Sequence, residues 1–214
     1  MKNCKSLIFG CILAVLALPL VGAVNDASAQ NILTNGDFET GDLTGWGVFG
    51  GNEEATVTVV TPGNGPSLPG VNHVLMNNTG EALGLLLKQT TVPGTAVPGT
   101  VYYLLDMNVL EAAVGGVAFY QIFVEAEGIG IVADTGAQGP FFPSGGFETY
   151  TGTLEAPALE GDPALFLTIQ ITATTGADVN STCVVQLDNV ALTQGEPPVA
   201  SEASSWSNVK AMYR

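Results

Sequence analysis

The stretch NILTNGDFETGDLTGW, residues 31–46, combines an apolar start, an Asn-Gly-Asp-Phe-Glu motif and a Gly-Asp turn that ends at a Trp. The segment VQLDNVAL, residues 185–192, lies near the other end of the chain and also places an acid inside a strand-like pattern. A charged group inside a strand needs a partner, because burying it alone costs several kcal/mol. We expect the two segments to pair in space, so that Glu39 and Asp188 share one cation that clips the first strand to the last.

Beyond this stretch the chain shows strand patterns and little helical periodicity. Short runs rich in Val, Thr, Tyr and Phe alternate with turn signals such as PGNG at 62–65 and PSGG at 143–146. Many short strands with such turns predict an all-β protein, a two-sheet antiparallel β-sandwich of the jelly-roll type. The expected strands are 31–39, 55–61, 73–78, 83–92, 100–110, 117–127, 130–133, 147–154, 164–173 and 182–193.

The first 29 residues have the features of a secretory signal peptide. Two lysines precede an apolar run over 7–21, and Ala-Ser-Ala at 27–29 is a cleavage site of small residues. The alternative is an uncleaved anchor, although the run is short for a membrane span. We predict a signal peptide over 1–29, one domain over 30–194, and a linker with a C-terminal tail over 195–214. The protein is then secreted, extracellular or on the cell surface, with no membrane insertion after cleavage.

The composition of the predicted domain excludes several ligand classes. Residues 30–195 contain one Lys, no Arg, one His and 17 Asp or Glu, and the chain carries a formal charge of −15. Nucleic acid is excluded as a partner, because no basic surface is present to displace its counterions. Anionic lipids and polyuronates are disfavoured for the same reason. Calcium is favoured, because it binds clustered oxygen ligands.

Cleavage of the signal peptide leaves Cys183 as the single cysteine of the mature chain. An exported domain with one Cys has no internal disulfide. Cys183 lies in an apolar strand pattern, which predicts a buried and unreactive thiol.

Several motifs together resemble carbohydrate-binding modules of the family 4/9 type, a galactose-binding-like calcium jelly roll. The end motifs are NGDFETGDLTGW at 35–46 and VQLDNVALT at 185–193. Between them, similar segments are NHVLMNN at 72–78, LKQTTVPGTAVPGTVYYLLDMNV at 87–109 and FETYTGTLEAP at 147–157. The resemblance covers residues 31–193. It implies a β-jelly roll, a structural calcium near the joined ends, and binding of a glycan or polysaccharide.

The resemblance also implies a set of calcium ligands. The side chains of Glu39 and Asp188 would bind the ion, together with backbone carbonyls at Asp37 and His73. Relatives often have a further acid just before the position of His73, where this chain has Gly-Val-Asn at 70–72. The alternative is that Asp37 only makes a turn and that Asp188 only caps a strand end.

Sugar binding on such a scaffold uses aromatic rings that stack on the apolar faces of sugars. Trp46 closes the first turn and is expected to be packed, as in the family. Strand alternation places Phe119 and Gln121 on one face and Tyr120 on the other, but it does not say which face is inside. We predict that Tyr103, Tyr120 and Gln121 form the sugar platform on a concave face.

An enzyme is the competing class of function. Glu125 and Glu127 share a strand face, as paired carboxylates do in glycosidases, but they lie at a strand end where solvated turn acids collect. A Ser-His-Asp set would require His73, the single histidine. We predict a non-catalytic protein that binds a neutral or calcium-bridged glycan. The alternative is a structural or adhesive surface or matrix protein that uses the calcium jelly roll without a glycan site.

The segment SWSNVKAMYR, residues 205–214, is apolar and basic, unlike the predicted domain. One interpretation is a frayed end or a short helix that docks on the domain. The other is a terminal tag read by export or surface-attachment machinery.

Overall fold

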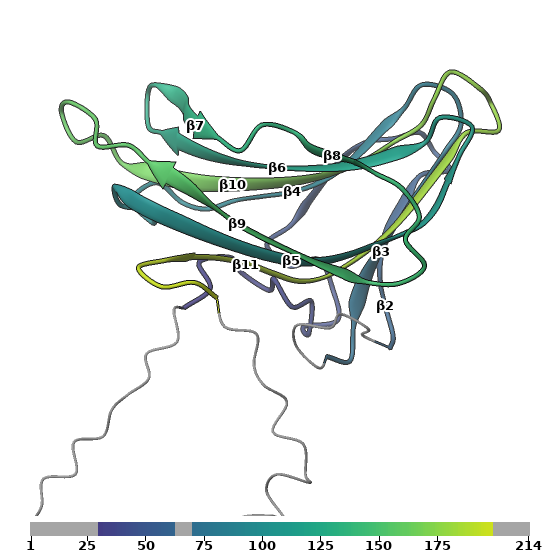
Figure 1. The fold of residues 1–214 in the computed structure, drawn as a ribbon, viewed down its shortest axis with the longest axis horizontal. Coiled ribbons are helices and arrows are strands. Elements are labelled where there is room, and N and C mark those ends of the chain that lie inside the picture. Colours follow the sequence, from purple (N-terminus) through teal and green to yellow (C-terminus); the bar gives the residue numbers. More distant parts are fainter. Residues whose placement is uncertain (1–29, 63–69, 199–214) are drawn as a thin grey trace, which may run out of the picture.

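The computed structural model describes residues 30–62 and 70–198, which form two antiparallel sheets packed face to face (Figure 1). The predicted two-sheet β-sandwich is therefore confirmed. Within these two ranges no helix is present, and thus none that is long and apolar enough to span a membrane. The predicted signal peptide and the SWSNVKAMYR tail lie outside the described residues.

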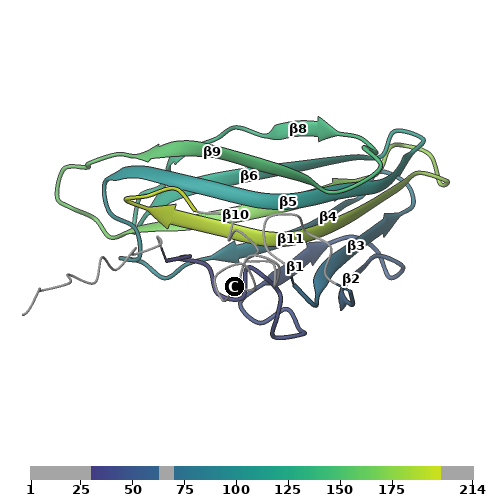
Figure 2. The same cartoon turned by 60° about the horizontal axis from the view of Figure 1, so that its bottom comes forward.

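Sheet A has six strands in the order β1-β4-β10-β6-β7, and β8 also pairs with β6. Its strands are β1 (Gly47–Gly50), β4 (Gly84–Thr90), β6 (Val117–Ala126), β7 (Gly130–Asp134), β8 (Gln138–Phe141) and β10 (Leu165–Thr174). Sheet B has five strands in the order β2-β3-β11-β5-β9, and Figure 2 shows β5 between β11 and β9. Its strands are β2 (Thr56–Val60), β3 (His73–Thr79), β5 (Gly99–Ala113), β9 (Glu148–Ala156) and β11 (Thr182–Gln194).

The largest departure from the expected strands is at the N-terminal stretch. Residues 31–39 form turns and bends, in which Asn35 and Phe38 have left-handed φ values of +51° and +57°, outside the β region. The segment still lies against β11. The Ile32 N–H donates to the Leu192 carbonyl at 2.8 Å, and the Val190 N–H donates to the Gly36 carbonyl at 2.7 Å. The expectation that the two ends of the domain pair is confirmed.

Two short strands were not expected, β1 and β8. Each has four residues: β1 contains two glycines, and β8 contains a glycine and a proline. Neither strand has the β-branched composition that predicts a strand. Both lie outside the central strands of sheet A and pair on one side only. Their position beside longer strands, and not their own propensity, makes them strands.

Alternating side chains build the core between the sheets. In β6 every second residue is buried, and the buried residues of β10 and β4 continue the same layer. Cys183 belongs to this layer and is a buried free thiol whose pKa is raised to about 11 by burial. The prediction of a buried thiol is thus confirmed, and burial disfavours the thiolate that would react.

Trp46 anchors the N-terminal stretch, as expected. It is buried, its ring lies 5.3 Å from the ring of Phe38, and its indole N–H donates to the Asn35 carbonyl at 3.1 Å. Burying this pair holds the turn at 40–45 against the sandwich. Asp42 shapes the turn itself, because its carboxylate accepts hydrogen bonds from Thr44 and Thr40, which lower its pKa.

Candidate functional site

The outer face of sheet A presents its residues in rows that cross three or four strands. The register aligns Phe49, Leu86, Thr172 and Phe119 in one row, and Gly47, Lys88, Gln170 and Gln121 in the next. A third row contains Thr90, Thr168, Phe123 and Asp134, and a fourth contains Phe166, Glu125 and Ile131. Neighbouring strands lie about 4.8 Å apart, so successive side chains in a row have that spacing.

On this face a row of polar groups lies between rows that contain phenylalanines. Its aromatic residues are Phe49, Phe119, Phe123 and Phe166, which lie on three different strands. Phe49 is 54% exposed and the others are half-buried, so their rings are reachable from solvent. Amide and charged groups fill the row between Phe119 and Phe123. The face therefore offers flat apolar surface next to hydrogen-bonding groups, the combination that sugar rings require.

Hydrogen bonds hold several polar side chains of the face in place. Gln121 donates from Nε2 to the Asp134 carboxylate at 3.0 Å. Thr168 donates to Glu125 and lies 2.9 Å from the hydroxyl of Thr90. Side chains fixed in this way lose little conformational entropy when a ligand binds.

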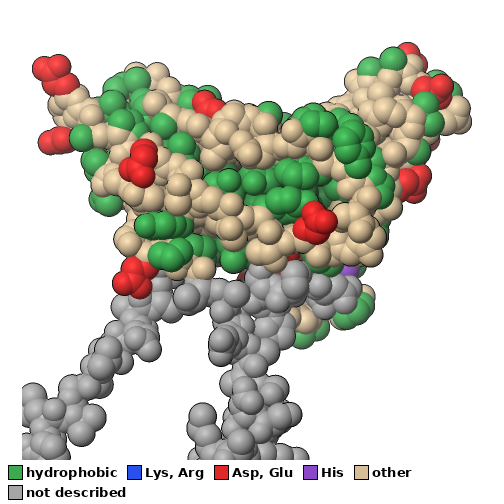
Figure 3. All heavy atoms as spheres, in the orientation of Figure 1, with side chains coloured by type: hydrophobic (Ala, Val, Ile, Leu, Met, Phe, Trp, Pro, Cys, Tyr) green, Lys and Arg blue, Asp and Glu red, His purple; other side chains and the backbone are tan. Residues whose placement is uncertain are grey.

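The face is also hollowed. The strands of sheet A curve toward the outside at both ends in Figure 1, and the surface above them dips between two raised ends in Figure 3. The β6–β7 turn and the loop at 157–164 rise at one end, and the loop at 175–181 rises at the other (Figure 1). A concave sheet face of this kind can hold an extended ligand along or across its strands.

The predicted sugar platform is wrong as a unit, because its three residues do not share a face. Tyr103 and Tyr120 point into the core and are 8% and 4% exposed, whereas Gln121 points outward from β6. The two tyrosine rings do meet, at 5.8 Å between centroids, but they do so inside the sandwich. Whether Gln121 contacts a glycan stays a prediction.

Tyr103 and Tyr120 belong to an aromatic cluster between the sheets, completed by Phe141 of β8 and Tyr150 of β9. Tyr120 stacks on Phe141 at 5.6 Å with an interplanar angle of 5°, and Phe141 lies 4.7 Å from Tyr150. Burial raises the pKa of the phenols of Tyr120 and Tyr150, so both stay neutral. The cluster packs between the two sheets, beside β8 of sheet A and the edge strand β9 of sheet B.

The predicted calcium ligands come from segments that the fold brings together. Glu39 accepts hydrogen bonds from the N–H groups of Val71 at 2.7 Å and Asn72 at 2.9 Å, directly before His73. His73 begins β3, which pairs with β11 one residue before Asp188. The N-terminal stretch, the start of β3 and the β11 bulge at 188–191 thus meet at one place.

The side chains at this place have protein partners. His73 bonds through Nδ1 to the Pro62 carbonyl at 2.6 Å and through Nε2 to Gln186 at 2.9 Å, so its ring is occupied. Asp188 is 1% exposed and accepts the Asn189 N–H at 2.8 Å, whereas Asp37 and Glu39 are exposed. Over the described ranges, no three Asp, Glu, His or Cys side chains are arranged to hold a metal ion. A calcium here would depend on two carboxylates and backbone carbonyls, the donor set that the resemblance implies.

Sequence reasoning missed Asp106, which lies opposite Asp188 in the β5–β11 pair. Asp106 is fully buried and accepts hydrogen bonds from Thr149 Oγ1 at 2.6 Å and from Asn189 Nδ2 at 2.8 Å. Its only signal in the sequence is an acid within a long apolar strand.

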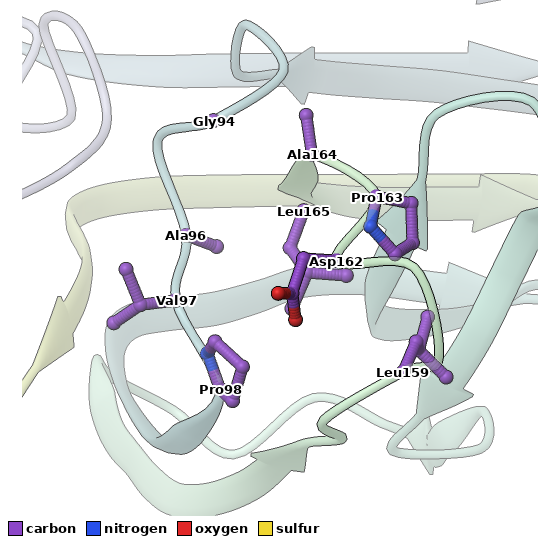
Figure 4. Close-up of a pocket in the computed structure, with 9 residues that line it drawn as sticks. All are labelled: Gly94, Ala96, Val97, Pro98, Leu159, Asp162, Pro163, Ala164 and Leu165. Carbon is purple, nitrogen blue, oxygen red and sulfur yellow. The ribbon is translucent and has the colours of Figure 1, made fainter.

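A pocket of about 280 Å³ lies at one end of the sandwich (Figure 4). The loop at 94–98 and the segment 159–165 form its walls, which are mostly apolar, and the Asp162 side chain lies between them. This pocket offers one carboxylate and no row of amide groups. The outer face of sheet A therefore has the richer set of binding groups.

Sequence reasoning also missed most of the outer face of sheet A. It paired Phe119 with Gln121 but could not choose between the two faces of β6, because both faces contain aromatic residues. Phe49 lies in a strand that was not expected, and Phe166 and Lys88 lie in expected strands whose neighbours were unknown. Phe119 is half-buried and Tyr120 is buried, so the face of β6 that contains Phe119 and Gln121 is the outer one.

The fold is similar to those of several solved structures. The enzymatically active domain of bacteriophage CBA120 tailspike protein 4 matches with a TM-score of 0.57 and 17% identity, over 76% of this chain and 21% of that chain. A structure of carbohydrate-binding modules from the beta-sandwich super family matches with a TM-score of 0.52 and 17% identity, over 78% and 64%. A cyclase from Fischerella sp. TAU matches with a TM-score of 0.50 and 20% identity, over 78% and 97%.

These similarities establish the fold, which both carbohydrate-binding modules and enzymes share. The chain spans less than two thirds of the length of the tailspike and carbohydrate-binding structures. Neither a protein-family model nor a curated protein matches the sequence. Membership of family 4/9 stays a prediction.

Proposed function

We propose that this protein is a secreted, non-catalytic carbohydrate-binding protein, whose glycan lies across the outer face of sheet A. The observation that carries the proposal is the pair of adjacent rows on that face. One row ends in exposed Phe49 and half-buried Phe119, and the next presents Lys88, Gln170 and Gln121. Phenylalanine rings would cover apolar sugar faces, and the amides would bond to hydroxyl groups.

The similarity to β-sandwich carbohydrate-binding modules supports this use of the fold by analogy. The shape of the face also supports glycan binding, because a hollowed sheet can contact several sugars of one chain at once (Figure 3). Shallow faces of this kind bind by many weak contacts. The favoured ligand is a polysaccharide or long glycan, neutral or bridged by calcium.

The state of the candidate acids favours binding over catalysis. Glu125 lies on the outer face and is held by Thr168, whereas Glu127 lies beyond the end of β6 in an exposed turn. A glycosidase needs two carboxylates that face each other across the scissile bond. The Asp162 pocket offers one acid among apolar walls. We therefore propose no catalytic residue.

We also propose one structural calcium at the junction of the N-terminal stretch, the start of β3 and β11. The side chains of Glu39 and Asp188 would hold it, with the backbone carbonyls of Asp37 and His73. The ion would neutralise acids in a chain that carries a large negative charge, and it would stabilise the fold in place of a disulfide. The Glu39 bonds to residues 71 and 72 support the proposal, because they hold the two segments in contact.

The test is retention of the full chain on a glycan array and on insoluble polysaccharides, in calcium and in chelator. We expect retention on at least one glycan, and loss of it when Gln121→Ala and Phe123→Ala are combined. Leu110→Ala is the control, because Leu110 is 49% exposed but lies in β5 of sheet B.

Retention that survives the double variant would place the glycan elsewhere. No retention on any glycan would favour the alternative, a structural or adhesive surface protein. A contact of the C-terminal tail with export or surface-attachment machinery is compatible with either function and stays a prediction.

A further inference from the structure

Lys88 is the single Lys or Arg of residues 30–198, a range that contains 18 Asp or Glu. It does not lie at a loop or a terminus. It is half-buried in β4, next to the edge strand β1 of sheet A, between Gly47 of β1 and Gln170 of β10, and it faces outward. The single cation of this range therefore lies on the outer face of sheet A.

No interaction within the described part of the chain explains the position of Lys88. No hydrogen bond or ion pair joins its ammonium group to any residue that the structure describes. The two nearest acids of the face have other partners. Asp134 binds Gln121 and the Gly136 N–H, and Glu125 binds Thr168. Asp134 also lies three strands away from Lys88, about 14 Å at the usual strand spacing.

An exposed aromatic ring lies beside this cation. Gly47 is the register partner of Lys88, and the ring of Phe49 lies so close over Gly47 that a Cβ atom there would be 2.8 Å from it. Phe49 is 54% exposed, so its ring is free to take a ligand on its open side. Because Gly47 has no side chain, the ring of Phe49 can lie over it, on the strand next to the lysine. A flat apolar contact and a positive charge are therefore next to each other.

On the basis of the proposed glycan binding, we infer that the bound glycan contains an acidic sugar, whose ring lies on Phe49 and whose anionic group binds Lys88. The anionic group is a carboxylate or a sulfate ester. A lysine suits either, because its ammonium is a point charge with three donors and no fixed geometry.

The charge of the protein limits how acidic the glycan is. A net charge of −15 repels a densely charged polyanion, and acids are spread over the surface in Figure 3. One lysine can neutralise one group at a time. The ligand is therefore a mainly neutral glycan with sparse acidic residues, and Lys88 selects the sugar that has one.

The test compares sparsely carboxylated, sparsely sulfated and unsubstituted forms of the same polysaccharides: xylan, mixed-linkage β-glucan and cellulose. Dissociation constants of the full chain are measured by depletion at low and high ionic strength. We expect one acidic form to bind about fivefold more tightly than the unsubstituted form, with the difference decreasing in high salt. The carboxylated and sulfated forms distinguish the two anions.

Three variants assign the preference to the lysine. Lys88→Met keeps the length and removes the charge, so it should bind acidic and neutral forms equally. Lys88→Arg keeps the charge and should retain the preference. Phe49→Ala should weaken binding of both forms together. Melting temperatures of both Lys88 variants should match that of the parent, because Lys88 makes no hydrogen bond or ion pair with the described residues.

The outcomes separate this inference from the proposed function. Equal binding of acidic and neutral forms by the parent would overturn the inference and leave glycan binding intact. A preference that persists in Lys88→Met would also overturn it. Absence of binding to every form would overturn both.

Discussion

The outer faces of the two sheets both contain polar side chains, but they use them in opposite ways. On sheet B, His73, Asp106 and Asn108 are at most 6% exposed, and each is hydrogen-bonded to a neighbouring side chain. On sheet A, Lys88, Gln121 and Gln170 are half-buried and reachable from solvent. Buried polar groups that bond to each other stabilise a fold, whereas polar groups that solvent can reach beside aromatic rings can bind a ligand. We therefore propose a structural role for the polar groups of sheet B and a binding role for those of sheet A.

The largest expected effect is on stability, at the inner side of sheet A. Tyr120→Ala should lower the free energy of unfolding by about 3–4 kcal/mol, because a buried aromatic ring is replaced by a cavity. Chemical denaturation measures this. The sequence alone led to the reverse expectation, a loss of glycan binding with little loss of stability. A loss under about 1 kcal/mol would return Tyr120 to the candidate binding residues.

The second prediction concerns a substitution that breaks the polar network of sheet B. Asp106→Ala should lower the free energy of unfolding by about 2–3 kcal/mol, because Thr149 and Asn189 lose a buried acceptor. Asp134→Ala is the matched control on sheet A, where an exposed acid should contribute about 0.5 kcal/mol or less. Equal losses in the two variants would contradict the assignment of structure to sheet B.

The third prediction concerns the calcium. At a hundredfold excess over its Kd, calcium should add about 2.7 kcal/mol to the stability of the full chain. Combining Glu39→Ala with Asp188→Ala should abolish the difference in melting temperature between calcium and chelator. Asp37→Asn is the control, because it keeps the backbone carbonyl. A calcium response that persists in the double variant would rule out this site.

The smallest expected change in stability distinguishes the faces within one strand. Phe119→Ala should lower the free energy of unfolding by about 1 kcal/mol, because Phe119 is half-buried beside Tyr120 on the other face of β6. The same variant should raise the Kd for a retained glycan about tenfold. Titration calorimetry and denaturation of one preparation give both values. An unchanged Kd would show that Phe119 does not contact the glycan.

Local patterns were enough to predict most of the strands. Nine of the ten expected segments overlap β2 to β7 or β9 to β11, because alternation of apolar residues is a property of each segment alone. The expected strand at 31–39 failed because Asn35 and Phe38 adopt positive φ, which alternation does not report. β1 and β8 were missed because their strand geometry comes from their neighbours.

The sequence by itself determined an all-β sandwich, the packed Trp46, the buried Cys183 and the pairing of the two ends of the domain. The tertiary structure alone decided which side of β6 is the core, and it placed Lys88 beside Phe49. The physical reason is that a period of two defines two faces but does not say which one is buried. That choice depends on the register between strands far apart in the chain, such as β4 and β10, which only the packing of both sheets sets.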